Sequence, residues 1–96
     1  MMDFVHNREL GRYEAWVDGE LAGETDYELD GDVADFNHTV VPPQFGGRGI
    51  AGSLVSFAMD DVRNAGKWQV RATCSYVAAW FGKHPDYADL LADESS

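Results

Sequence analysis

Hydrophobic and polar residues alternate along three consecutive stretches in the first half of the chain, at residues 13–17, 21–29 and 33–41. A period of two is typical of β-strands that bury one face. Asp18-Gly19 and Asp30-Gly31 separate the stretches, and Asp-Gly favours a type I′ turn, in which both central residues have positive φ. The pattern predicts an antiparallel three-stranded meander, whereas residues 1–10 are expected to be irregular.

The hydrophobic period changes to that of a helix over residues 50–65, and Gly66 is a suitable C-terminal stop. The apolar positions of this face are Ala51, Leu54, Val55, Ala58, Val62 and Ala65. Residues 68–74 alternate again, so the chain contains a strand–helix–strand unit. Such a unit places its second strand parallel to its first.

A second, shorter helix is expected near the end of the chain. Ser75 is a candidate N-cap for a helix over residues 76–83, which must end at His84-Pro85. Residues 87–91 are expected to form a short helical turn, and residues 92–96 a frayed tail. The sum is one α+β domain over residues 1–96, a small mixed sheet with one long and one short helix.

Composition narrows the possible function classes. Seventeen acidic residues against seven basic ones give a formal net charge of −10, which argues against a nucleic-acid partner. No apolar run approaches the roughly 20 residues of a membrane span, and the N-terminus lacks the pattern of a signal peptide. A single cysteine cannot form an internal disulfide, so we expect a cytoplasmic protein. The acidity fits either a high-salt interior or an ordinary acidic protein.

The loop Gln44-Phe45-Gly46-Gly47-Arg48-Gly49 lies between an expected strand and the long helix. Glycines let an anion approach the backbone, and the amides and dipole at a helix N-terminus favour negative charge. The spacing matches neither a P-loop nor a dinucleotide fingerprint. The alternative is a tight turn that only connects strand to helix. No His, Cys, Asp and Glu spacing indicates a metal site.

Two side chains are candidates for chemistry. Cys74 precedes a helix N-terminus, where a thiol pKa falls and a thiolate could act as a nucleophile. His38 is expected on the same strand face as Phe36 and Val40, where its imidazole could act as a base for an amine or for Cys74. The alternatives are a small buried cysteine and a packed histidine. His6 is expected to be solvated.

These features together resemble the GNAT acetyltransferase superfamily. Its acyl-CoA signature, Gln/Arg-x-x-Gly-x-Gly/Ala between strand and helix, is matched by Gln44, Gly47 and Gly49. The resemblance extends to the very short YjdJ-type members of the superfamily, over nearly the whole chain. The motifs that carry it are His38-Thr39 before Val41-Pro42, Cys74-Ser75, and His84-Pro85-Asp86-Tyr87.

The resemblance implies a minimal GNAT-like fold and an acetyl-CoA-dependent N-acetyltransferase that acts on an amine, directly or through an acetyl-Cys74. Main-chain amides from Gln44 to Ile50 would hold the diphosphate, and the pantetheine arm would lie between the third and fourth strands. The expected cofactor-binding residues are Val40, Val41, Gln44, Phe45, Gly46, Gly47, Arg48, Gly49, Ile50, Ala51, Lys83 and His84. The elements that usually build an acceptor pocket are missing, so a non-catalytic CoA-binding module or sensor is the alternative. The acidic surface favours a cationic acceptor.

Overall fold

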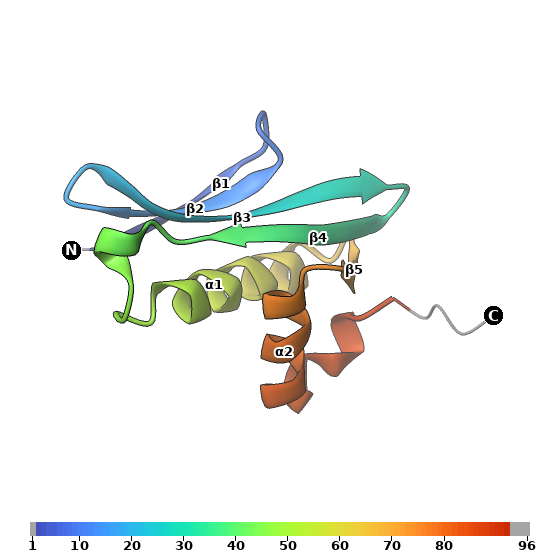
Figure 1. Cartoon of the computed structure of the whole chain (residues 1–96). Helices are drawn as coiled ribbons and strands as arrows, with labels where there is room; N and C mark the ends of the chain where they lie inside the picture. Colours follow the sequence, from blue (N-terminus) through green and yellow to red (C-terminus); the bar gives the residue numbers. More distant parts are fainter. Residues whose placement is uncertain (1, 93–96) are drawn as a thin grey trace.

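Residues 2–92, which the computed structural model describes, form a five-stranded sheet with helices against one face (Figure 1). The strands, in their order across the sheet, are β1 (Met2–Asn7), β2 (Arg12–Val17), β3 (Glu20–Asp30), β4 (Val33–Val40) and β5 (Gln69–Ala72). The helices are η1 (Pro43–Phe45), α1 (Ile50–Ala65), α2 (Ser75–Lys83) and η2 (Pro85–Leu90). The first four strands pair antiparallel and β5 pairs parallel with β4, which confirms the predicted α+β class and strand–helix–strand unit.

The N-terminal segment is a strand, so the prediction of an irregular start is wrong. All six residues of β1 pair with β2, and the meander therefore has four strands. Phe4 and His6 face the helices, and Phe4 stacks on Phe57 of α1 with 5.1 Å between ring centroids. Val5, between them, points away from the helices but is apolar. The alternation of apolar and polar residues that would predict a strand is therefore not visible in the sequence.

The two Asp-Gly hairpins differ in their turns. Asp18 and Gly19 both have positive φ, +49° and +82°, as the predicted type I′ turn requires. In the second hairpin strand pairing continues through Asp30, so the central residues are Gly31 and Asp32. Only Gly31 has positive φ, which is the pattern of a type II′ turn, and the type I′ prediction is wrong there.

The core lies between the sheet and α1. The buried residues of α1 are Ile50, Leu54, Val55, Ala58, Met59 and Val62. α2 adds Val77, Trp80 and Phe81, which cover the end of the sheet near β5. Among residues 2–92, no helix has both the length and the hydropathy that a membrane crossing requires.

The C-terminal segment is held against α1 and β5. Arg63 of α1 donates two hydrogen bonds to the Asp89 carboxylate, at 2.9 and 3.0 Å, and the Tyr87 hydroxyl donates to Asp60 at 2.6 Å. The N–H of Ala92 donates to the carbonyl of Val70 at 2.8 Å. Ala92, the first residue of the expected frayed tail, is therefore bonded to β5, and the rest of that predicted tail, residues 93–96, lies outside the described part of the chain.

An extra residue in β4, Asn37, changes which side chains face the helices. Two consecutive residues of β3 pair with Phe36 and His38, so Asn37 is a β-bulge. Because side chains alternate along a strand, the extra residue turns His38 to the face of the sheet that the helices do not cover, here called the open face. Thr39 is turned to the other side, the helix face. The prediction that His38 shares the face of Phe36 is wrong: Phe36 is fully buried, whereas His38 is exposed.

β5 runs beside only the first half of β4. The parallel pairing ends at Phe36 and Ala72, and the N–H groups of Thr73 and Cys74 then both donate to the carbonyl of Phe36, at 3.1 and 2.9 Å. The chain turns there into α2. The second half of β4 therefore has a free edge beside the start of α2 (Figure 1).

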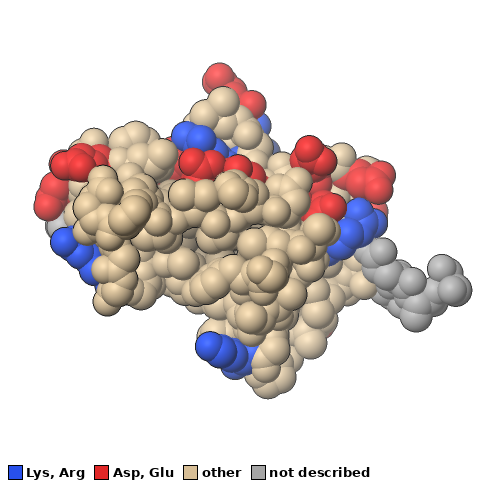
Figure 2. Space-filling model, in the orientation of Figure 1, with Lys and Arg blue, Asp and Glu red and all other residues tan. Residues whose placement is uncertain are grey.

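Charge is unevenly distributed over the surface (Figure 2). In this view acidic side chains gather over the strands and their turns, whereas the lower part, where α1 and α2 lie in Figure 1, is mostly uncharged with basic side chains at its margin. An anion that approaches this helical part avoids most of the acidic surface visible in the view.

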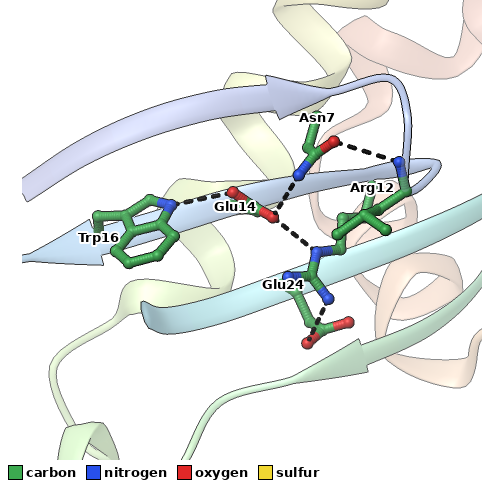
Figure 3. A network of polar contacts seen from close by, with 6 residues as sticks. Asn7, Arg12, Glu14, Trp16 and Glu24 are labelled. Carbon is green, nitrogen blue, oxygen red and sulfur yellow. Dashed lines mark hydrogen bonds and ion pairs between the residues drawn. The ribbon is translucent and has the colours of Figure 1, made fainter. Parts of the chain in front are cut away.

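The open face of the sheet carries a polar network centred on Glu14 (Figure 3). Glu14 is only 4% exposed, and its carboxylate accepts hydrogen bonds from Asn7 at 3.0 Å, Arg12 at 2.7 Å and Trp16 at 3.0 Å. Arg12 also donates to Glu24 of β3 at 3.3 Å. Burial raises the pKa of Glu14, but these donors outweigh burial, and the pKa lies below its ordinary value.

His6 lies in a second buried cluster, on the helix face. Its ring stacks on Tyr13 at 4.0 Å, with Nε2 2.6 Å from the Tyr27 hydroxyl and Nδ1 3.3 Å from the Asp61 carboxylate, which also accepts from Tyr13 at 2.7 Å. The imidazole is 12% exposed, so the expectation of a solvated histidine is wrong. Burial lowers the pKa of His6, and this effect exceeds the opposing effect of Asp61.

Glu14→Gln should lower the free energy of unfolding at neutral pH by about 2–3 kcal/mol, because a hydrogen-bonded charge is lost and Arg12 loses a partner. The folded-state pKa of Glu14 is depressed, so its contribution is present above the unfolded value of 4.5 and is lost as the pH falls below it. Urea unfolding at several pH values measures both effects. The exposed Glu20→Gln is the control, and an equal loss in both variants would contradict the network.

His6→Ala should lower the free energy of unfolding by about 2 kcal/mol, because a buried ring and its hydrogen bonds are lost. His38→Ala, at an exposed position, should stay within about 0.5 kcal/mol of wild type. The pKa of His6 is lower in the folded state, so wild type should lose stability as the pH falls below the unfolded value of 6.5. A His6→Ala variant as stable as wild type would contradict the placement of β1.

Candidate functional site

The glycine loop begins with a short 3-10 turn anchored in the core. Phe45 is 7% exposed, and its N–H donates to the carbonyl of Pro42 at 2.9 Å. The N–H of Gly46 donates to Pro43 at 3.0 Å. These two amides already donate within the loop. Fewer of the amides predicted to bind a diphosphate, those from Gln44 to Ile50, are therefore available to it.

The start of α1 presents donors to open space. Gly47 and Gly49 have φ of +77° and +72°, and Gly49 is the N-cap residue, with no side chain capping the helix. The first bond of the helix runs from the N–H of Ser53 to the carbonyl of Gly49, so the amides of residues 50–52 have no helical acceptor. A Cβ at either glycine would meet no atom within 4 Å. An anion could therefore approach these amides closely.

A groove of about 600 Å³ runs between α1 and α2 from this point. Gly52 and Ser53 line its beginning, and Lys83 and His84 line it at the end of α2. The hydroxyl of Tyr76 lies 3.5 Å from the position that a Cβ of Gly52 would take. The structure thus brings the start of α1 and the two basic residues predicted from sequence to one groove.

His84 has two roles in this groove. It ends the helix: its backbone N–H donates to the carbonyl of Phe81, and its ring nitrogen Nδ1 lies 2.8 Å from the carbonyl of Trp80. The imidazole also stacks on the Trp80 indole at 4.1 Å, which leaves Nε2 as the free ring nitrogen. The structure therefore shows His84 at the end of the helix, and the other interpretation, contact with a phosphate of CoA, stays a prediction.

Cys74 lies at the junction of β5 and α2. It is the N-cap residue of α2, a position expected for Ser75, which is instead the first helical residue. The thiol donates to the hydroxyl of Thr39 at 3.5 Å. Burial raises the pKa of Cys74, but the Thr39 hydroxyl and the backbone amides of Val77 and Tyr76 outweigh burial, and the pKa lies below its ordinary value.

Thr39 is a site residue that sequence reasoning missed. Its hydroxyl lies 3.0 Å from that of Thr25, which is fully buried on β3. No feature of the sequence indicates this contact, since a regular strand would have turned Thr39 away from the helices and His38 toward them. The bulge exchanges the two residues, so Thr39 is the neighbour of Cys74.

His38 lies on the opposite face with acidic neighbours. It is paired across the sheet with Asp26, and one Asp26 carboxylate oxygen is buried with no hydrogen-bond partner among the described residues. Burial, followed by the nearby Glu24, raises the pKa of Asp26 to about 6. His38 and Cys74 face opposite sides of the sheet, so the imidazole is not placed to deprotonate the thiol.

The free edge of β4 lies between the open face, which carries His38, and the helix face, which carries Cys74. Val40 ends the strand and is 39% exposed, and Val41 follows it beside Gly23 at the start of the loop. A thioester that lies along this edge could be reached by Cys74 from the helix face and by an amine near His38 from the open face. Among residues 2–92, no group of His, Cys, Asp or Glu side chains is arranged to hold a metal ion.

Solved structures of acetyltransferases share this fold. A GCN5-like protein from Staphylococcus aureus, solved by NMR, aligns over 94% of this chain and 87% of its own, with 18% identity and a TM-score of 0.71. The ribosomal-protein-S18-alanine N-acetyltransferase of Escherichia coli aligns over 84% of this chain, with 13% identity and a TM-score of 0.64. The ribosomal-protein-alanine N-acetyltransferase of Brucella melitensis aligns over 88%, with 22% identity and a TM-score of 0.60. The alignments cover 51% and 64% of these last two proteins.

The sequence also matches a protein family. A comparison with curated proteins found no match. The family model of the GCN5-related N-acetyl-transferases, however, matches residues 12–90, which include every strand except β1 and all of the helices. The chain therefore belongs to the GCN5-related N-acetyl-transferase family.

Proposed function

We propose that this protein transfers the acetyl group of acetyl-CoA to a primary amine of a cationic molecule. One observation carries the proposal: uncapped amides at the start of α1 face open space at one end of the free β4 edge, and Cys74 lies beside that edge. A bound thioester needs an anion site for its diphosphate and reactive groups near its carbonyl carbon. The amides of α1 and the β4 edge beside Cys74 are the elements that support these two requirements.

In the proposed complex the diphosphate lies at the amides of residues 50–52. Arg48 is the adjacent cation, and its guanidinium lies 5.5 Å from the Phe45 ring centroid. The nucleotide end lies in the groove toward Lys83 and His84, and the pantetheine arm lies along Val40. Local donors and a weakly charged helical face support anion binding by a protein whose net charge is −10.

Two routes of transfer fit the geometry. In direct transfer His38 or Asp26 takes one proton from the ammonium, and the free amine attacks the thioester carbonyl from the open face. The bond to the CoA sulfur then breaks, and the second nitrogen proton goes to the CoA thiolate or to solvent. In the covalent route the Cys74 thiolate attacks first, forming a new S–C bond as the bond to CoA sulfur breaks. The amine then forms the amide bond as the bond to the cysteine sulfur breaks; the sulfur returns as thiolate, and the proton of the amine goes to solvent or a base.

Charge supports a cationic acceptor. Seventeen acidic residues give the surface its sign, and Glu24 and Asp26 share the open face with His38. The second candidate is a CoA-binding module without turnover. It is supported by length, since the alignment covers only 51% of the Escherichia coli enzyme.

Coenzyme A should bind wild-type protein and raise its melting temperature, because a ligand specific for the native state stabilises it by about 2.7 kcal/mol at 100 times its Kd. Gly47→Val should weaken binding at least tenfold, since the side chain enters the space beside the α1 amides. Gly31→Val is a matched control, because Gly31 also has positive φ and open space but lies in a distant hairpin. Calorimetry measures both; no binding by wild type would remove the proposal.

Mass spectrometry after mixing with acetyl-CoA separates the two routes. In the covalent route one acetyl group should appear on Cys74, the single cysteine, and Cys74→Ala should abolish turnover on an amine panel. An unmodified Cys74, with Cys74→Ala as active as wild type, would instead establish direct transfer. Tight CoA binding without release of CoA on any amine would favour the non-catalytic module.

A further inference from the structure

We infer that Thr39 is a positioning residue for the acetyl transfer: its hydroxyl, held in place by Thr25, orients the sulfur of Cys74 and stabilises the sulfur anion. The catalytic consequence rests on the proposed function. The physical claim about the thiol does not, because the thiol can be titrated without any substrate.

The placement of Thr39 follows from two departures from a regular sheet. The Asn37 bulge turns Thr39 to the helix face, and the end of the β4–β5 pairing at Phe36 leaves room for Cys74 beside it. The sulfur and the Thr39 hydroxyl oxygen are 3.5 Å apart, which suits a hydrogen bond to sulfur. The backbone of Thr39, in addition to its hydroxyl, contributes to lowering the pKa of Cys74.

Thr25 gives the Thr39 hydroxyl a second partner. It is fully buried, and the two hydroxyl oxygens are 3.0 Å apart, so either can donate to the other. With the thiol protonated, the S–H donates to Thr39 and Thr39 can donate to Thr25. When the S–H proton leaves to solvent, both hydroxyls can rotate, so that Thr25 donates to Thr39 and Thr39 to the sulfur anion.

Charged side chains near Cys74 point elsewhere. On β4, Asp35 and His38 face the open side, as does Asp26 on β3. Arg71 of β5 lies within 4 Å of Asp35, also away from the helices. On α2 itself the titratable neighbour is Tyr76, which is exposed. The stabilisation of the sulfur anion is thus assigned to neutral donors, namely the Thr39 hydroxyl and the backbone of Thr39, Tyr76 and Val77.

The Thr39 hydroxyl would act when Cys74 enters and leaves the reaction. The thiolate attacks the acetyl carbonyl, the bond to CoA sulfur breaks, and the CoA thiolate takes up a proton from solvent. In the second step the amine displaces Cys74 sulfur, and the proton of the amine goes to solvent or a base. The donated hydrogen bond stabilises Cys74 as an attacking and as a leaving thiolate.

The test titrates the single thiol of the full chain with iodoacetamide across pH, with no ligand present. Thr39→Val should reduce the thiolate fraction at pH 7 about tenfold, because a hydrogen bond to a charge is lost. Thr39→Ser, which keeps the hydroxyl, should restore the wild-type titration. Thr25→Val should give a smaller shift in the same direction.

Thr73→Val is the matched control. Thr73 directly precedes Cys74, but its exposed hydroxyl donates to Asp35 at 2.6 Å on the open side, so the titration should not change. A Thr39→Val titration that equals wild type, with thermal unfolding showing an intact fold, would overturn the inference. If Thr39→Val does not fold, the comparison of Thr39→Ala with Thr39→Ser decides in the same way.

The two proposals can fail separately. If wild type binds no CoA but Thr39→Val still shifts the titration, the proposed function fails and the role of Thr39 at the sulfur stands. If CoA binds and the titration does not shift, only the role of Thr39 fails. Where turnover is measurable, Thr39→Val should move the pH profile of kcat toward higher pH and leave the KM for acetyl-CoA unchanged.

Discussion

The carbonyl of Phe36 accepts hydrogen bonds from both Thr73 and Cys74, and this shared acceptor determines where the sheet opens. Beyond it β5 can no longer follow β4, so the chain turns into α2 with Cys74 as N-cap. The same departure frees the edge of β4. A regular parallel pair would have used these backbone groups in the ladder and left no free edge on β4. The candidate site therefore depends on the sheet ending early, and the rest of the fold stabilises that shape.

The meander and the helices supply the rigidity that an opened sheet lacks. The Glu14 network joins β1, β2 and β3 on the open face. On the opposite, helix face the His6 cluster joins these strands to α1 through Asp61. The second half of β4 thus keeps β3 as its neighbour while its other edge is free. The open face also carries the Asp26 carboxylate. Burial disfavours its charged form, so this residue lowers the stability of the fold. Residues that oppose stability in this way often serve function.

Local chemistry made much of the fold predictable from sequence. The period of α1 and its stop at Gly66 gave the helix as observed, from residue 50 to 65, and Asp18-Gly19 formed the expected turn. The glycine loop was also identifiable, because few residues other than glycine adopt positive φ beside a helix start. The missed features are tertiary. β1 has only a weak alternation of apolar and polar residues, and it forms because β2 pairs with it. No residue type at or near Asn37 predicts the bulge there.

The bulge shows how one inserted residue changes a mechanism inferred from sequence. With a regular strand, the histidine of the His38-Thr39 pair would lie near the thiol and a general base for Cys74 would be the natural interpretation. With the bulge, a hydroxyl contacts the sulfur and the imidazole faces an acidic pair across the sheet. A hydroxyl cannot hold the proton of a thiol, but it can stabilise the anion. The arrangement therefore places the two residues of this pair on different faces: Thr39 contacts the sulfur of Cys74 on the helix face, and His38 is paired with Asp26 on the open face.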